Sequence, residues 1–224
     1  MLIWSEVYPT WMSANVYGAL HFSHTAAVWP AQGRYSFTVV TAMLDIGRGS
    51  WPSTQSRSYN TYLREFKQLL KMDVNLATYV DRKTQRFVHE QRKEMGNKTT
   101  TILVGMEDLP YFRYRGRIAE IMNSSEYKRD NELVALRLCR SYIPEYDILQ
   151  LSKLYFLHRT ILTNPFNTTY FVWMDGGYGH GHDIYPSDGS WIPKELLENP
   201  GRITFIERPP GVLHYEKVKD TMHK

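Results

Sequence analysis

The segment YFVWMDGGYGHGHD, Tyr170–Asp183, joins a short apolar run to a carboxylate and a glycine-rich stretch. Short apolar runs bounded by turn residues are typical of strands that are buried on both faces. Residues 170–174 are therefore predicted to form a buried strand that ends at Asp175. Strands of this kind occur mainly in parallel sheets covered by helices, so the segment already favours an α/β fold.

The rest of the chain repeats this alternation. Further strands are predicted at residues 36–44, 76–80, 99–106 and 202–207. Helices are predicted between them, at residues 56–72, at 85–94, in two segments within 116–140, and from Pro144 to Asn164. Strands separated by helix-length segments, without tight hairpins, predict an α/β fold with a mostly parallel open sheet and flanking helices.

Length and composition suggest how the chain is divided. Its 224 residues are 42% apolar and 22% charged, which is typical of a globular domain. The first 33 residues contain one charged side chain, Glu6, and no clear hydrophobic period. We therefore expect an N-terminal arm over residues 1–34 and a single domain over residues 35–224.

Several classes of protein are excluded by the same numbers. No apolar run is long enough to cross a bilayer, so we expect no transmembrane segment. The single cysteine, Cys139, excludes an intrachain disulfide and a multi-cysteine zinc site. The run YFRYRGR, residues 111–117, interleaves aromatic rings with arginines, as grooves for single-stranded nucleic acid do. The net charge is only +4, so we expect no nucleic-acid partner and explain the run as a solvated loop or a diphosphate-binding cluster.

Three predicted strands run directly into an aspartate: Asp45, Asp81 and Asp175. Ligands of open α/β sheets bind outside the carboxyl ends of the strands, so these aspartates point to a site at that edge. Aspartate is also a common turn residue after a strand, and for each of the three a purely structural role stays open.

Asp175 is the best candidate for a metal ligand. A carboxylate at a strand end, followed by two glycines, suits Mg²⁺ or Mn²⁺ bound to substrate phosphates. His180, His182 and Asp183 are close in sequence and could add ligands. The simpler alternative is a glycine-rich surface loop, and a third is a metal hydrolase built on the two histidines and Asp183.

A second group of candidates surrounds the strand at 36–44. Thr41 and Ala42 leave space near the strand end, Asp45 can accept hydrogen bonds from a ribose or base, and Arg48 or Arg57 can bind phosphate. The aromatic rings of Trp51 and Tyr59 could stack on a base or sugar. Packing is the alternative for both, and it is favoured for Trp51, while Tyr59 fits the apolar face of its helix. The dinucleotide and P-loop glycine motifs are absent.

Three N-x-[ST] sequences begin at Asn97, Asn123 and Asn167. These sequences are acceptors for N-glycosylation and therefore permit a location in the lumen of the secretory pathway if the protein is eukaryotic. The absence of a signal sequence indicates the cytoplasm if it is bacterial.

Two segments carry a resemblance to a known family. The sequence TVVTAMLDIGRGSW, residues 38–51, and the sequence KLYFLHRTILTNPFNTTYFVWMDGGYGHG, residues 153–181, resemble the HtrL/YibB family. Bacterial members of that family are associated with the assembly of lipopolysaccharide core sugars, and the family also has animal members. The resemblance extends from about Phe37 to about Arg208 and covers most of the chain.

The family is similar to glycosyltransferases of the GT-A type. The resemblance implies transfer of a sugar from a nucleotide-sugar donor to a glycan or glycolipid acceptor, with Mn²⁺ or Mg²⁺. It places Thr41, Ala42, Asp45 and Arg48 at the nucleotide end of the first strand. It also places Asp175 where GT-A enzymes carry the aspartates of their D-x-D motif.

The chain differs from the GT-A pattern in two respects. Residues 173–175 are Trp-Met-Asp, so one of the usual two acids is missing, and only 49 residues follow Asp175. These differences suggest a domain that is truncated at its C-terminal side. They also define an alternative function, namely a catalytically inactive α/β relative that binds or scaffolds a partner.

Overall fold

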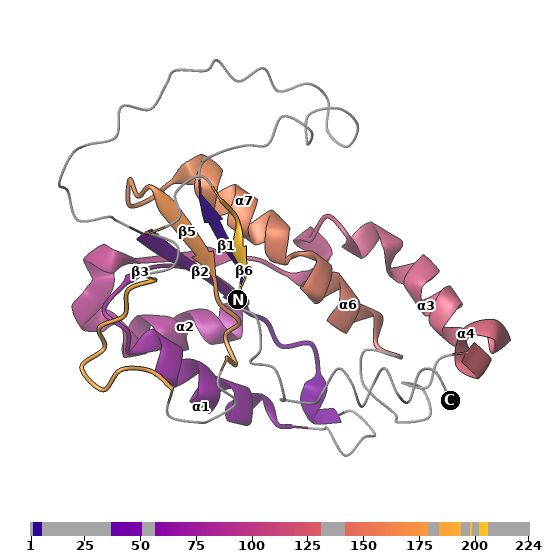
Figure 1. Ribbon diagram of the computed structural model, residues 1–224. Coiled ribbons are helices and arrows are strands. Elements are labelled where there is room, and N and C mark those ends of the chain that lie inside the picture. Colours follow the sequence, from indigo (N-terminus) through magenta and orange to yellow (C-terminus); the bar gives the residue numbers. More distant parts are fainter. Residues whose placement is uncertain are drawn as a thin grey trace.

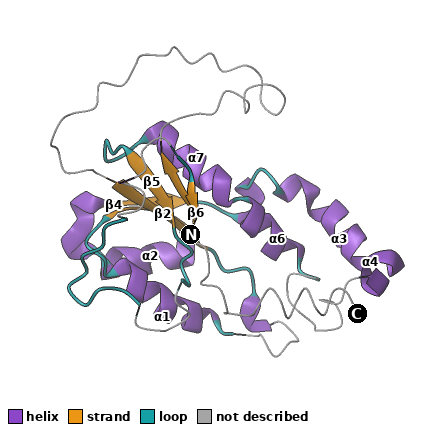
Figure 2. Ribbon diagram, viewed as in Figure 1, coloured by secondary structure: helices purple, strands orange, loops and turns teal. Residues whose placement is uncertain are grey.

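The computed structural model describes residues 2–5, 37–50, 57–130, 142–178, 184–193, 198 and 202–205. These residues form one twisted sheet with helices on both of its faces (Figure 1). Figure 2 shows the strands as a single layer between the helices. The predicted α/β class, with a mostly parallel open sheet and flanking helices, is confirmed.

The sheet has six strands in the order β4-β3-β2-β5-β1-β6. Their bounds are Leu2–Ser5 (β1), Phe37–Met43 (β2), Asn75–Val80 (β3), Thr99–Leu103 (β4), Tyr170–Trp173 (β5) and Thr204–Phe205 (β6). Strands β4, β3, β2 and β5 are parallel, whereas β1 runs antiparallel to both of its neighbours. No strand was predicted near residue 2, because four residues without a repeating pattern give too little signal.

The α-helices are Tyr59–Leu70 (α1), Arg82–Gln91 (α2), Arg115–Asn123 (α3), Ser125–Asp130 (α4), Pro144–Leu151 (α6) and Lys153–Thr163 (α7). Short 3-10 helices are Arg48–Ser50 (η2), Lys93–Lys98 (η3), Met106–Asp108 (η4) and Phe112–Tyr114 (η5).

The two faces of the sheet carry separate cores. Helices α1 and α2 cover one face, where Phe66 and Leu69 pack with Val39 of β2 and Leu76 of β3. Helices α6 and α7 cover the other face, where Phe156 of α7 lies parallel to the ring of Trp173, with ring centroids 5.9 Å apart. The side chains of β2 therefore contact helices on both sides, whereas those of β5 contact α7 on one side and Trp191 on the other. Burial on both faces explains why the two strands are largely apolar.

Two helices differ from the sequence prediction. The helix predicted at residues 85–94 begins at Arg82 instead, because the side chain of Asp81 accepts a hydrogen bond from the backbone N–H of Thr84 and caps the helix. The long helix predicted from Pro144 is two helices that meet at Ser152. The Ser152 hydroxyl donates to the carbonyl of Ile148, an interaction that is known to bend helices.

Arg92 connects several elements at the edge of the sheet where the parallel strands begin. Its side chain is 1% exposed, and its guanidinium donates to the carbonyls of Leu70 and Met72, 3.0 and 2.8 Å away, and to that of Val74, 2.8 Å away. It also donates to the hydroxyl of Thr99 in β4. Burial lowers the pKa of Arg92 to about 10, an effect that Asp73 partly offsets. This buried charge is well satisfied.

The strand order defines where a ligand is expected. From β2 the chain moves outward on one side to β3 and β4, and then returns to the other side of β2 as β5. The carboxyl ends of β2 and β5 therefore flank the point at which the direction of strand addition reverses. Open α/β sheets bind ligands at this position.

Candidate functional site

A pocket of about 230 Å³ lies at the carboxyl ends of β2 and β5, and we call it the strand-end pocket. Its walls come from the residues that follow β2, from α1, from α6 and the start of α7, and from the turn that follows β5. It therefore lies between helices of the two faces of the sheet, at the position that the strand order indicates.

Most of the predicted site residues lie together in this pocket. Those that line it are Ala42, Asp45, Arg48, Arg57 and Asp175. Thr41 does not line it, because its side chain is fully buried within the sheet. The predicted metal ligands His180 and His182, as well as Asp183 and Trp51, lie outside the described residues.

Asp175 is bound by two donors of the chain itself. The indole Nε1 of Trp173 donates to its Oδ1 atom at 2.7 Å, and the ammonium of Lys153 lies 2.8 Å from Oδ1 and 3.0 Å from Oδ2. Partial burial alone would raise the pKa of Asp175. The charge of Lys153 and the hydrogen bonds from Lys153 and Trp173 outweigh this effect, so the pKa of Asp175 lies below its ordinary value.

Arg48 is held between two tyrosine rings. Its guanidinium carbon lies 4.6 Å from the ring centroid of Tyr62 in α1 and 5.1 Å from that of Tyr146 in α6. Its Nη1 atom also donates to the hydroxyl of Tyr62 at 2.5 Å. This arrangement fixes the position of the cation at the wall of the pocket.

The other two strand-end aspartates have structural roles. Asp81 accepts hydrogen bonds from the backbone N–H and hydroxyl of Thr84 and from the backbone N–H of Asp45. Asp45 accepts from the backbone N–H of Gly47 and from Lys83, which is 3.3 Å away. Asp45 lines the pocket and Asp81 does not, so the structure separates two residues that looked equivalent in the sequence.

Tyr59 joins the same hydrogen-bond network. Its hydroxyl makes a short hydrogen bond with that of Thr84, and its pKa is raised by burial and by the nearby carboxylates of Asp81 and Asp45. The ring lines the pocket as well. Tyr59 therefore packs against the core and also lines the pocket.

Several residues that line the pocket were not assigned to it from the sequence. They are Tyr62, Glu65, Tyr146, Gln150, Lys153 and Trp173. Glu65 had a detectable signal, because it follows Tyr62 by three residues and precedes Leu69 by four, and thus interrupts an apolar helix face. Lys153 gave no such signal, since its distance from Asp175 is set by the break between α6 and α7.

The two glycines after Asp175 have different surroundings. A Cβ atom on Gly176 would lie 2.8 Å from Met43 Cε and 3.2 Å from the carbonyl oxygen of Ala42, so this position is closely packed. A Cβ atom on Gly177 would meet only the Oε2 atom of Glu65, at 3.4 Å. The space that the two glycines were expected to leave for a ligand is therefore found at Gly177. At Gly176, core atoms already occupy it.

The described part of the chain contains no group of three or more histidine, cysteine or acidic side chains that could hold a metal ion. A magnesium or manganese ion that also binds substrate phosphates needs only one or two protein carboxylates. Asp175 fits that requirement as a single ligand, once Lys153 gives up its contact.

Within the described residues, no helix is long and apolar enough to cross a membrane.

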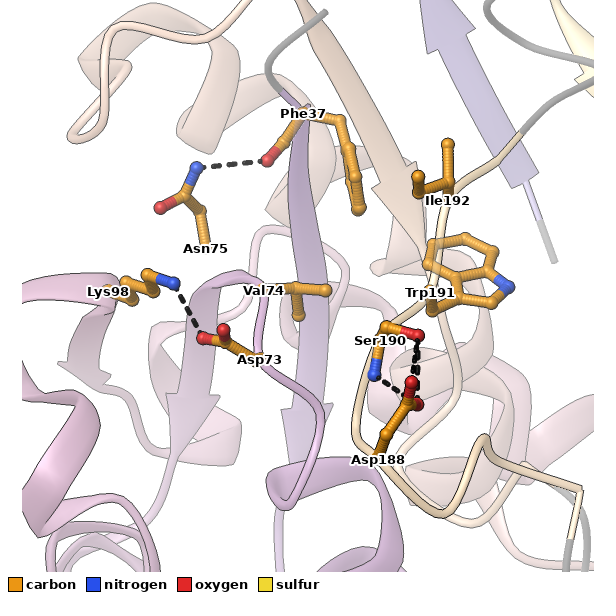
Figure 3. A pocket seen from close by; sticks show the side chains of 9 residues that line it. All are labelled: Phe37, Asp73, Val74, Asn75, Lys98, Asp188, Ser190, Trp191 and Ile192. Atoms are coloured by element: carbon orange, nitrogen blue, oxygen red, sulfur yellow. Dashed lines mark hydrogen bonds and ion pairs between the residues drawn. The ribbon is translucent and has the colours of Figure 1, made fainter. Parts of the chain in front are cut away.

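A second pocket, of about 300 Å³, lies at the opposite edge of the sheet, beside the first residues of β2 and β3 (Figure 3). Its charged side chains have partners from the chain: Lys98 Nζ lies 2.6 Å from Asp73 Oδ1, and Asp188 accepts hydrogen bonds from Ser190. Because ligands of such sheets bind at the carboxyl ends of the strands, the strand-end pocket is the better candidate site.

Comparisons with known proteins agree with the resemblance carried by the two anchor segments. The family described as "Bacterial protein of unknown function (HtrL_YibB)" matches residues 35–215. The chain is similar to Protein HtrL of Escherichia coli (strain K12), with 28% identity over 156 residues, which are 66% of this chain and 53% of that protein. The chain thus spans about half the length of this relative. No solved structure matches the chain.

Proposed function

Because the chain belongs to the HtrL_YibB family, whose function is unknown, we propose a function from the strand-end pocket itself. The protein is a glycosyltransferase that binds a nucleotide sugar in this pocket and transfers the sugar to a glycan or glycolipid acceptor. Its fold is of the GT-A type, with the diphosphate of the donor above the carboxyl ends of β2 and β5.

One observation carries the proposal. The three basic side chains Arg48, Arg57 and Lys153 line a single pocket at the reversal point of the sheet. They come from three separate segments of the chain, and the two arginines offer the planar donors that bind phosphate oxygens well. Ligands with two adjacent phosphates match this cluster.

The remaining walls suit the uncharged parts of such a donor. The rings of Tyr59, Tyr62 and Tyr178 offer stacking surfaces for a base or a sugar. Asp45, which is about three-quarters buried, can accept a hydrogen bond from a ribose hydroxyl. The position of Asp45 at the end of β2 agrees with the nucleoside role that the family resemblance implies.

Charge neutralisation at the departing nucleotide is the chemical step that the pocket must support. Lys153, 22% exposed and held against Asp175, places a positive charge beside the expected diphosphate. The predicted Mn²⁺ or Mg²⁺ would be held by Asp175 with His180 and His182. When bound, it would act as a Lewis acid on the diphosphate oxygens.

A thermal-shift panel tests this proposal. Wild-type protein is heated with UDP-sugars and GDP-sugars, each with Mn²⁺ and with EDTA. We expect at least one nucleotide sugar to raise the melting temperature, because a ligand that binds only the folded state stabilises it. The variants Arg48→Ala and Lys153→Met should lose this shift, whereas Lys67→Met, an exposed lysine of α1 outside the pocket, should keep it. No shift with any nucleotide sugar would contradict the proposal.

One observation favours the alternative of a catalytically inactive binding module. Both oxygens of Asp175 are already bonded to Lys153 and Trp173, as they would be if Asp175 only stabilised the fold. In that case Asp175→Ala lowers the melting temperature and leaves the response to every nucleotide sugar unchanged. If Asp175 binds the cation, the same variant loses the part of the shift that requires Mn²⁺.

A further inference from the structure

The carboxylate of Glu65 is the feature of the strand-end pocket that the phosphate-binding cluster leaves unexplained. The side chain is 8% exposed and lines the pocket. Among the described residues, its Oε2 atom has no hydrogen-bond partner. Its Oε1 atom lies 3.6 Å from Arg57 Nη1, which is too far for a good hydrogen bond. A buried carboxylate with so few partners is costly to the fold.

The packing of α1 does not require an acid at this position. Glu65 lies between Tyr62 and Leu69 on the face of the helix that covers the sheet, where an apolar side chain would fit the pattern. Its only charge partner in the described chain, Arg57, is 47% exposed and can be solvated without it. The stability of the fold therefore does not explain why an acid is present here.

An ionised carboxylate only accepts hydrogen bonds, so a ligand that satisfies Glu65 must donate them. Phosphate groups do not, and their negative charge would be repelled. The carboxylate borders Gly177, where a Cβ atom would lie 3.4 Å from Oε2, and both residues line the pocket. The neutral, hydroxyl-bearing part of a ligand is the chemical group that fits this place.

We infer that Glu65 accepts hydrogen bonds from hydroxyl groups of the sugar portion of a nucleotide sugar. This inference rests on the proposed function and deepens it, because it assigns the sugar to the α1 side of the pocket. The phosphates then contact Lys153 at the start of α7 and Arg48, which lies between Tyr62 of α1 and Tyr146 of α6. Glu65 thereby makes the pocket distinguish a nucleotide sugar from the bare nucleoside diphosphate.

Isothermal titration calorimetry tests the inference with two matched pairs of probes, UDP against UDP-glucose and GDP against GDP-mannose. Wild-type protein should bind one nucleotide sugar more tightly than its nucleotide. Glu65→Gln keeps the shape of the side chain and removes its charge. We expect this variant to bind the nucleotide sugar about 10-fold more weakly, and its affinity for the nucleotide to change less than about twofold. The control is Glu90→Gln, an exposed acid on α2.

Two further variants separate binding from folding. Gly177→Ala places a methyl group beside Glu65. It should also weaken the binding of the nucleotide sugar more than the binding of the nucleotide. Glu65→Asp keeps the charge but shortens the side chain by one methylene. Its affinity for the nucleotide sugar should lie between those of wild type and Glu65→Gln. Each variant is first checked for an unchanged circular dichroism spectrum and a cooperative melting transition.

The possible failures are distinguishable. If no probe binds wild-type protein, the proposed function is wrong and the inference falls with it. If nucleotides bind but Glu65→Gln weakens UDP and UDP-glucose equally, Glu65 contacts the nucleotide portion and the inference alone is wrong. An unchanged affinity of Glu65→Gln for every probe that binds wild type overturns the inference as well.

Discussion

Arg92 and Glu65 are both buried charged side chains, and they lie at opposite edges of the same sheet with opposite surroundings. The guanidinium of Arg92 donates to backbone carbonyls and to a hydroxyl at the edge where the parallel strands begin. The carboxylate of Glu65, at the edge where they end, has one distant ionic partner in the described chain. The comparison suggests that the first charge serves the fold and the second serves a ligand.

The strongest test of the comparison is Arg92→Met. It removes the donors to the carbonyls of Leu70, Met72 and Val74 and to the hydroxyl of Thr99, so we expect a loss of about 3–5 kcal/mol in the free energy of unfolding. Urea denaturation measures this loss. The control is Arg86→Met, an exposed arginine on α2, which should cost less than about 0.5 kcal/mol. Similar results for both variants would show that Arg92 is not a structural charge.

The variant Asp81→Ala tests whether the hydrogen bonds of a charged side chain, or its location at one edge of the sheet, determine its contribution to stability. Asp81 lies near the pocket edge of the sheet, as Glu65 does, but its carboxylate has several donors of the chain. Loss of the helix cap and of the contact to Asp45 should cost about 1–2 kcal/mol in the free energy of unfolding. If Asp81→Ala were as stable as wild type, hydrogen bonding would not explain the difference between Arg92 and Glu65. Their positions at opposite edges of the sheet would explain it instead.

Glu65→Gln should leave the free energy of unfolding unchanged or raise it by up to about 1 kcal/mol. An amide is easier to bury than a carboxylate with so few partners, and Arg57 is exposed enough to be solvated alone. The measurement is again urea denaturation, without ligand. A loss of 2 kcal/mol or more, on the order of that for a broken buried network, would place Glu65 in the same structural class as Arg92.

The smallest effect concerns Asp175 and pH. Its pKa lies below the ordinary value in the folded state, so it stabilises the fold at neutral pH, and this contribution is lost as the pH falls below about 4. Because the carboxylate is half exposed, the contribution should be at most about 1 kcal/mol. Melting curves between pH 3 and 7 should therefore fall less steeply for Asp175→Asn. Parallel curves for both proteins would contradict the role of the Lys153 pair.

The sequence was sufficient to predict the parallel part of the sheet. Strands β2, β3 and β5 appear as largely apolar segments because they are buried on both faces, whereas β4 is rich in threonine and only partly buried. Pro144 correctly marks the start of α6. Asp45, Arg48 and Asp175 were correctly grouped at one edge, since the carboxyl ends of parallel strands must lie together. The assignment of residues 1–34 and 35–224 as arm and domain stays a prediction.

Other parts of the site depend on the tertiary structure. The packing of α7 on the sheet determines both the break at Ser152 and the contact between Lys153 and Asp175. No local sequence pattern predicts either feature. Tyr62 and Trp173 looked like core residues because their rings are indeed packed. Each also lines the pocket, and the sequence cannot separate these two roles of one side chain.

Strand β1 has a consequence for how the protein folds. It pairs residues 2–5 with residues 170–173, so its partner strand is synthesised roughly 170 residues later. Strand β6 pairs with β1 and cannot precede it in the sheet. Closing so long a loop is entropically unfavourable until the parallel strands have formed, so we expect β1 to join the sheet after them. Until it does, β5 is an open edge that can pair with another chain. Aggregation during synthesis should therefore depend on these four residues more than on any part of the core.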